Sequence, residues 1–118
     1  MLMPTFTIEL EKLPPSDATS TMYRVKGKLS LETVSRFIQE MRPEPSQNLI
    51  LEMSGVSFLD SAGVGALVSL FVSRRTQGKT LALTALSPQA IAVVTVAGLQ
   101  NLLPIYKTLE EATAGCKS

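Results

Sequence analysis

Apolar and polar residues alternate with a period of two in the first part of the chain, a pattern that predicts two half-buried β-strands. We expect these strands over residues 5–11 (TFTIELE) and 22–29 (MYRVKGKL). The segment between them is rich in Pro, Ser, Thr and Asp, which favours an exposed connection longer than a tight turn. The two strands are therefore expected to pair as a hairpin.

Helical spacing follows the second strand. Ser30 is a suitable N-cap for a helix that ends before Pro43. The apolar positions of this helix recur every three or four residues and are Leu31, Val34, Phe37, Ile38 and Met41. The next run, residues 48–53 (NLILEM), is continuously apolar and predicts a buried strand. Because a helix separates this strand from the previous one, we expect the two strands to be parallel.

A second, strongly periodic helix is expected after a loop at residues 54–63, and Gly78 ends it. Its apolar face is formed by Val64, Leu67, Val68, Phe71 and Val72. Residues 80–86 predict another strand. Ser87-Pro88 then provides an N-cap followed by proline at the first helical position, and Ala97-Gly98-Leu99 closes that third helix.

The last elements are short. Residues 102–106 predict a strand, and Pro104 within it favours a place at the edge of the sheet. Thr108 and Glu111 have the spacing of a capping box, which opens a final helix that fades before Gly115. The order ββαβαβαβα predicts a single α/β domain over residues 1–118, with a mixed sheet covered by helices.

Composition excludes several classes of function. The formal net charge is +1 and the basic residues are scattered, which argues against nucleic acids and anionic membranes as partners. Histidine is absent, so a Ser-His-Asp triad cannot form, and the acidic residues lack calcium-loop spacing. We expect no metal and no cofactor.

No apolar run approaches the roughly 18 residues that span a bilayer. Cys116 is the single cysteine, which fits a reducing compartment, and the cytoplasm is the default expectation.

Ser61 is the candidate functional residue, because it lies in the segment 58–65 (FLDSAGVG) between the buried strand and the most periodic helix. The first amides of a helix lack intrahelical partners and lie at the positive end of its dipole, so they would stabilise a phosphate on Ser61. The same segment also fits a purely structural role, with Asp60 or Ser61 as N-cap and Gly63 and Gly65 allowing close approach. It lacks the further glycine or lysine of a nucleotide-binding loop.

The string Asp60-Ser61-Ala62-Gly63-Val64-Gly65 resembles the D-S-[ST]-G-[LIV]-G motif of the STAS domain family, specifically the bacterial anti-sigma factor antagonists. The resemblance covers nearly the whole chain, including the order of elements. Gly27-Lys28-Leu29-Ser30 lies where the family has a Gly-x-Leu-Asp turn. Leu86-Ser87-Pro88 is similar to its later helix start, and Ala97-Gly98-Leu99 to its helix end.

In that family, the serine after the aspartate is phosphorylated by an anti-sigma factor that is also a serine kinase, and a dedicated phosphatase removes the phosphate. The resemblance implies that Ser61 is this serine. It also implies a regulator of transcription that binds the anti-sigma factor when unphosphorylated and releases it when phosphorylated. The protein is then a binding switch and not an enzyme.

Three positions depart from the family pattern. Ala62 replaces a second hydroxyl residue, which leaves Ser61 as the only acceptor in the motif. Lys28 and Ser30, which are also candidate partner-binding residues, replace acidic residues of the first turn, so a charged contact to the partner is lost or reversed. We expect the docking surface to include small residues opposite the apolar stripe of the second helix, namely Ala66, Ser69, Ser73 and Thr76.

Two other interpretations are open. The same domain can act as a scaffold in a transporter or sensory complex without being phosphorylated. A hydrolase with Ser61 as nucleophile would need a general base, and the sequence places none beside that serine.

Overall fold

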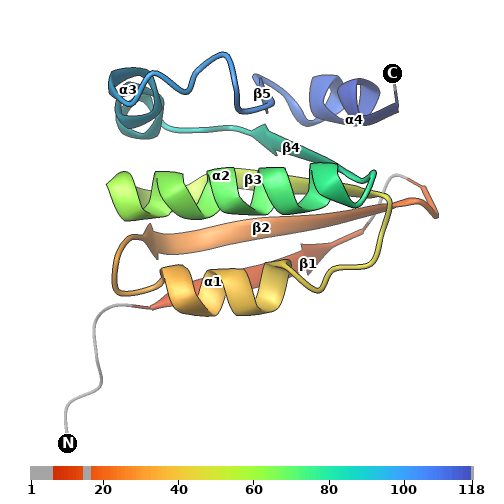
Figure 1. Cartoon of the computed structure of the whole chain (residues 1–118), viewed down its shortest axis with the longest axis horizontal. Coiled ribbons are helices and arrows are strands. Elements are labelled where there is room, and N and C mark those ends of the chain that lie inside the picture. The colour runs from red at the N-terminus through yellow and green to blue at the C-terminus, as the bar shows by residue number, and fades with distance from the viewer. Residues whose placement is uncertain (1–6, 15–16, 118) are drawn as a thin grey trace, which may run out of the picture.

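In the residues that it describes, 7–14 and 17–117, the computed structural model contains a five-stranded sheet and four helices (Figure 1). The elements follow in the order β1 (Ile8–Leu13), β2 (Ser20–Leu29), α1 (Val34–Met41), β3 (Asn48–Leu59), α2 (Ser61–Thr76), β4 (Thr80–Thr84), α3 (Pro88–Val96), β5 (Ile105–Tyr106) and α4 (Leu109–Lys117). This order confirms the predicted ββαβαβαβα arrangement.

The strands lie in the sheet in the order β1-β2-β3-β4-β5. β1 and β2 form the predicted antiparallel hairpin, with Leu13 opposite Met22. The remaining neighbours are parallel, so β3 pairs with both β2 and β4, and Asn48 lies opposite Ser20 and Thr80. β5 is an edge strand, as predicted, but it contains only Ile105 and Tyr106 instead of residues 102–106. Residues 5 and 6 of the predicted first strand lie outside the described residues.

The two faces of the sheet have different coverings because side chains alternate along each strand. On one face, Leu51 and Leu83 belong to the main core together with Phe37 of α1 and Leu67 of α2. On the other face, Met22, Ile50 and Ala82 form a smaller cluster with Ala112 of α4. The connections β2–α1–β3 and β3–α2–β4 are both right-handed crossovers, and both move along the sheet in the same direction. They therefore place α1 and α2 on the same face of the sheet, as Figure 1 shows.

The start of α1 corrects the sequence prediction. Ser30 does not cap this helix, which begins at Val34, and Leu31 is 71% exposed. Instead, the buried hydroxyl of Thr33 donates to the Lys28 carbonyl at 2.7 Å and accepts the Ser30 amide at 3.0 Å. These hydrogen bonds hold residues 30–33 in a turn, so the helix starts one turn later than its apolar spacing suggests.

Further boundaries differ from expectation, and β4 ends at Thr84 instead of residue 86. β3 continues through Leu59, because β2 is long enough to pair with it up to Leu29 opposite Leu59, so residues 54–59 are strand and not loop. α4 runs through Gly115 to Lys117 instead of fading before Gly115. That glycine lies so close to the hydroxyl of Tyr106 that a Cβ would overlap it, and this packing supports the last turn.

The buried face of α2 is also rotated relative to the prediction. Val64 and Leu67 are buried as expected, but Val72 is exposed and Leu70 is fully buried in its place. The same face carries Arg74, which is almost completely buried.

Arg74 joins three segments through backbone carbonyls. Its guanidinium donates to the carbonyls of Thr80 at 2.6 Å, Ser46 at 2.6 Å and Glu44 at 3.1 Å. Burial lowers the pKa of this guanidinium below its ordinary value, and the charge of Glu44 acts in the opposite direction. One side chain thus ties the end of α2 to the loop before β3 and to the first residue of β4.

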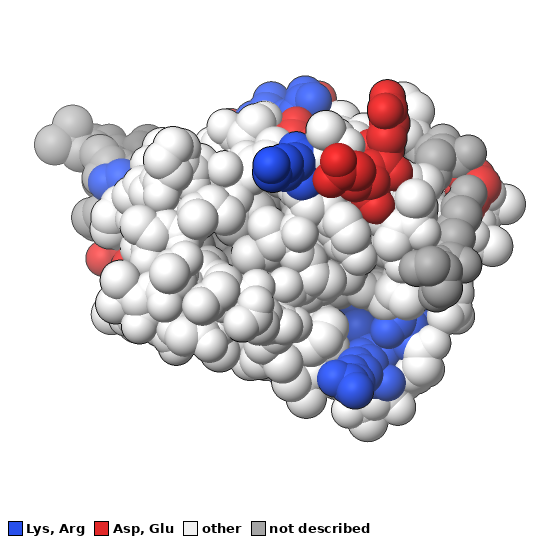
Figure 2. All heavy atoms as spheres, turned by 90° about the horizontal axis from the view of Figure 1, so that it is seen from above, with Lys and Arg blue, Asp and Glu red and all other residues white. Residues whose placement is uncertain are grey.

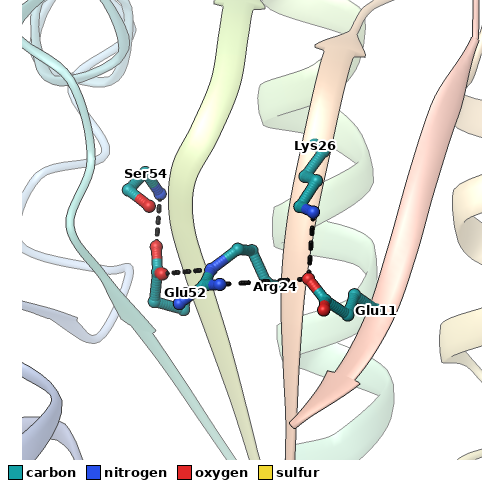
Figure 3. Close-up of polar contacts among 5 residues, drawn as sticks. All are labelled: Glu11, Arg24, Lys26, Glu52 and Ser54. Atoms are coloured by element: carbon teal, nitrogen blue, oxygen red, sulfur yellow. Dashed lines mark hydrogen bonds and ion pairs between the residues drawn. The ribbon is translucent and has the colours of Figure 1, made fainter.

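The part of the sheet that α4 leaves uncovered carries an ion-pair network across three strands (Figure 3). Arg24 of β2 contacts Glu52 of β3 at 2.7 Å, and Lys26 contacts Glu11 of β1 at 3.0 Å. Burial by itself would raise the pKa of Glu52, but hydrogen bonds from Ser54 and Arg24 outweigh this effect, and the net pKa is lowered.

Candidate functional site

The junction between β3 and α2 is organised by Asp60, which is the N-cap of α2. One carboxylate oxygen, Oδ1, accepts the amide of Gly63 at 2.9 Å. The other, Oδ2, accepts the amide of Leu31 at 3.1 Å, from the turn that precedes α1. A single side chain therefore caps the helix and holds the neighbouring turn beside it.

Gly63 is required by a close approach of backbone. A Cβ at this position would overlap the carbonyl oxygen of Leu29 and come within 2.7 Å of a methyl group of Leu59. Gly65, two residues further along α2, lines a cavity beside the helix and has open space around the position of a Cβ. The two motif glycines thus have different roles, since only Gly63 is needed for packing.

Ser61 occupies the first helical position of α2 and is exposed to solvent. The first turn of α2 contains no acidic residue, but Asp60 precedes it and Glu32 lies near enough for its pKa to respond to Asp60. The hydroxyl of Ser30, which donates to Glu32 at 2.6 Å, lowers the pKa of Glu32 below its ordinary value. The surroundings of Ser61 therefore combine free helix amides with two carboxylates.

A groove of 540 Å³ opens beside Ser61, between α2 and α3. We call this cavity the α2–α3 groove; it is lined by Ser61, Val64, Gly65, Ala92, Val93, Val96, Ala97 and Leu99. None of these side chains carries a charge, and the hydroxyl of Ser61 is the only polar side-chain group among them.

The other wall of the groove, α3, is fixed at its start. Ser87 is its N-cap and accepts the amide of Ala90 at 3.1 Å, with Pro88 at the first helical position, as predicted. The side chain of Gln89 is hydrogen-bonded to the backbone of Leu59 at the end of β3. Gly98, with a φ of 76°, follows the helix end. These contacts position α3 against the strand that leads to Ser61.

The surface around α3 is uncharged over a wide area, as Figure 2 shows. No Asp, Glu, Lys or Arg occurs from Thr80 through Tyr106. Several apolar side chains on this segment are nevertheless exposed, including Ile91, Leu102 and Val96, of which Val96 is 90% exposed. An exposed apolar surface next to a groove is typical of a protein interaction site. The sequence prediction missed this surface, although the charge-free run was a signal that could have revealed it.

Comparison with known protein families matches residues 8–112 to the STAS domain. The chain belongs to the STAS domain family. The match spans every strand and reaches into α4, so it includes both walls of the α2–α3 groove.

Solved structures with the same fold support this assignment. An anti-sigma factor antagonist from Mycobacterium paratuberculosis aligns with 99% of this STAS domain and 100% of its own chain, at a TM-score of 0.80 and 19% identity. The anti-sigma factor antagonist SpoIIAA in its unphosphorylated form gives 0.72 and 21%, over 94% of this chain and 96% of its own. A sulfate transporter family protein from Wolinella succinogenes gives 0.73 and 20%, over 86% and 87%.

The predicted docking residues of this STAS domain lie in different environments. Ala66 and Ser30 are only 7% and 3% exposed, so their prediction as surface residues is wrong. Ala66 packs in the main core, and Ser30 is enclosed by the turn that Thr33 holds. Lys28 and Thr76 are exposed, whereas Ser69 and Ser73 are half-buried, and the hydroxyl of Ser69 accepts a hydrogen bond from Arg42 at 3.0 Å.

Within residues 7–14 and 17–117, no three Asp, Glu, Cys or His side chains are grouped so that they could hold a metal ion. Over the same part of the chain, none of the helices has the length and apolar character needed to cross a membrane.

Proposed function

We propose that this STAS domain is an anti-sigma factor antagonist that binds an anti-sigma factor with serine kinase activity through the α2–α3 groove. Phosphorylation of Ser61 releases the partner, and a phosphatase that acts on phospho-Ser61 restores binding. The protein then controls transcription as a binding switch in the cytoplasm, without catalytic activity of its own. Two structures of the same fold carry the name anti-sigma factor antagonist, which supports this choice within the family.

The observation that carries the proposal is the position of Ser61. Its hydroxyl is exposed at the start of α2, where a kinase can reach it, and it lines the groove at the same time. A phosphate at this position adds a charge of roughly −1.5 to −2 to the rim of an uncharged groove. The helix amides compensate that charge within the domain, so the fold is expected to persist.

The effect of phosphorylation is therefore expected at the interface. An apolar partner surface in the groove would have to desolvate the phosphate without providing a positive charge to pair with it. Burying an unpaired charge costs several kcal/mol, and each 1.4 kcal/mol reduces affinity about tenfold. The negative charges of Asp60 and Glu32 add to the repulsion of any acidic partner group. We expect a loss of affinity of about a hundredfold or more.

The test compares the binding of wild type, Ser61→Ala and Ser61→Asp to a candidate anti-sigma factor kinase. Ser61→Ala should bind like the unphosphorylated wild type and should not accept phosphate from the kinase and ATP, as measured by intact mass. Ser61→Asp should bind more weakly, although less weakly than the phosphorylated protein, because aspartate has less charge and fewer acceptor oxygens.

Ser35→Asp is the matched control, since Ser35 is exposed on α1 and does not line the groove. This variant should retain wild-type affinity, and thermal unfolding should show that all four proteins are folded. Equal affinity of wild type, Ser61→Ala and Ser61→Asp would contradict the switch, even though the family assignment would stand.

A second candidate function is a scaffold within a transporter complex, and the similarity of fold to a sulfate transporter family protein favours it. A scaffold needs no modification of Ser61. If a permease co-purifies with the domain, and if neither kinase treatment nor Ser61→Asp alters that association, the scaffold replaces the switch.

A further inference from the structure

A second cavity lies on the other side of α3 from the groove. It has a volume of 530 Å³ and is lined by Ala85, Leu86, Ile91, Gln100, Ile105, Tyr106 and Lys107. We call it the α3–β5 cavity. Its size lies in the range of small-molecule sites, which are mostly apolar with a few polar groups. The cavity also begins where β4 ends, and the carboxyl ends of parallel strands are a common place for ligands in α/β folds.

The wall of the α3–β5 cavity contains an irregular backbone position. Among the described residues, Ala85 is the only residue other than glycine with a positive φ, 61°. A positive φ at a residue other than glycine costs stability, and proteins tend to retain such strain at binding sites.

The polar groups of the cavity define the ligand chemistry. Lys107 is the only charged residue in the lining, and no described carboxylate lies within 4.0 Å of its ammonium group. Gln100 adds an amide that can donate a hydrogen bond. The hydroxyl of Tyr106 is directed at Gly115 of α4, so this polar end is turned toward the helix. The remaining lining residues, Ala85, Leu86, Ile91 and Ile105, are apolar.

We propose that the α3–β5 cavity binds a small organic acid, with its apolar body against Leu86, Ile91 and Ile105 and its carboxylate near Lys107. The charge-free segment from Thr80 through Tyr106 supplies no acidic side chain that would repel this carboxylate. The acidic residues Glu110 and Glu111 follow in α4 and do not line the cavity. This site is separate from Ser61 and does not depend on phosphorylation.

Octanoate, hexanoate and 1-octanol are suitable probes, used below the concentrations at which they aggregate. Binding is followed by methyl NMR of the full chain. Octanoate should shift the methyl signals of Leu86, Ile91 and Ile105, and it should bind about tenfold more tightly than hexanoate, because each buried CH₂ contributes about 0.8 kcal/mol. It should also bind a few-fold more tightly than 1-octanol, since an exposed charge pair contributes modestly.

Two substitutions test the site directly. Ile91→Trp should fill the cavity and abolish octanoate binding. Lys107→Met should weaken octanoate binding a few-fold without changing the affinity for 1-octanol. Lys107 is exposed, so this substitution should leave the fold intact. Lys79→Met is the control, because Lys79 does not line this cavity, and it should leave both affinities unchanged.

Three results would overturn the proposal. The first is the absence of saturable shifts with octanoate. The second is shifts centred on Val64, Val93 and Val96, which would place the probe in the α2–α3 groove instead. The third is an equal loss of octanoate affinity in Lys107→Met and Lys79→Met, which would show a non-specific charge effect.

Discussion

Gln89 and Leu59 form a pair of hydrogen bonds that joins α3 to the end of β3. The side-chain amide of Gln89 donates to the Leu59 carbonyl at 2.7 Å, and its side-chain oxygen accepts the Leu59 amide at 3.1 Å. A glutamine side chain thus takes the place of a further strand at the end of β3. Since Leu59 is followed directly by Asp60 and Ser61, this pair fixes the spacing between the two walls of the α2–α3 groove.

Replacing Gln89 by methionine should therefore affect both stability and partner binding. The loss of two hydrogen bonds to backbone groups should lower the free energy of unfolding by about 1–2 kcal/mol. Partner affinity should fall as well, because α3 is no longer held against β3. Urea unfolding and binding titrations measure the two effects, with Gln39→Met, on the exposed side of α1, as the control. A fall in stability with unchanged partner affinity would show that the position of α3 does not matter for docking.

The two motif glycines give a second prediction, in which the same substitution has opposite effects on stability. Gly63→Ala should destabilise the domain by about 2 kcal/mol or more, because its Cβ overlaps the Leu29 carbonyl. Gly65→Ala should stabilise α2 by up to about 1 kcal/mol, because alanine is the better helix former and its Cβ meets open space.

Partner binding separates these variants further. The methyl group of Gly65→Ala projects into the α2–α3 groove and should weaken partner affinity despite the higher stability. Thermal unfolding and binding titrations on both variants measure these effects. If Gly65→Ala is more stable and binds as well as wild type, then the partner does not enter the groove.

Much of the fold could be predicted because local signals agreed with the tertiary structure. Ser87-Pro88 marks the start of α3, and the alternation in β1 and β2 marks the hairpin. The start of α1 could not be predicted, because Ser30 is a good N-cap by type. Its turn is held outside the helix by the hydroxyl of Thr33 and by a contact from Asp60, which lies far away in the sequence. The extent of β3 depends likewise on pairing with β2, which no local pattern reveals.

The candidate site was predicted only in part for the same reason. Asp60 and Ser61 were found from their motif, and their places at the helix start follow from local chemistry. The groove beside them is formed by α3, more than 25 residues further along the chain, so its existence depends on tertiary packing. Ala66 was misassigned because α2 contacts neighbours on more than one side, which leaves a narrower free face than a simple amphipathic helix has.

Arg74 provides a third prediction, on stability alone. Arg74→Met should lower the free energy of unfolding by about 2–4 kcal/mol, because it leaves the partly buried carbonyls of Thr80, Ser46 and Glu44 without their donor. Arg74→Lys should lower the free energy of unfolding less than Arg74→Met does, but the variant should still be less stable than wild type. An ammonium group cannot reach all the carbonyls that are spread over the width of a guanidinium. Arg75→Met is the control, because Arg75 is exposed, and it should change stability little. Chemical unfolding measures the stability of all three variants. Equal stabilities would show that the hydrogen bonds of Arg74 to the three segments do not stabilise the domain.

The ion-pair network on the open face of the sheet predicts how stability changes with pH. The pKa of Glu52 is lower in the folded protein than its ordinary value, so the unfolded chain binds the proton more tightly. The contribution of Glu52 to stability is thus fully present at neutral pH and is lost as the pH falls below the unfolded pKa, about 4.3, and through the folded one. Glu52→Gln removes this contribution and should unfold more easily than wild type at pH 7, with the difference shrinking toward pH 3.

Glu110→Gln, at an exposed position of α4, should instead follow the wild-type pH profile. Urea unfolding from pH 7 to pH 3 measures the profiles, and a constant difference between wild type and Glu52→Gln would show that Glu52 stabilises the sheet by packing and not by its charge.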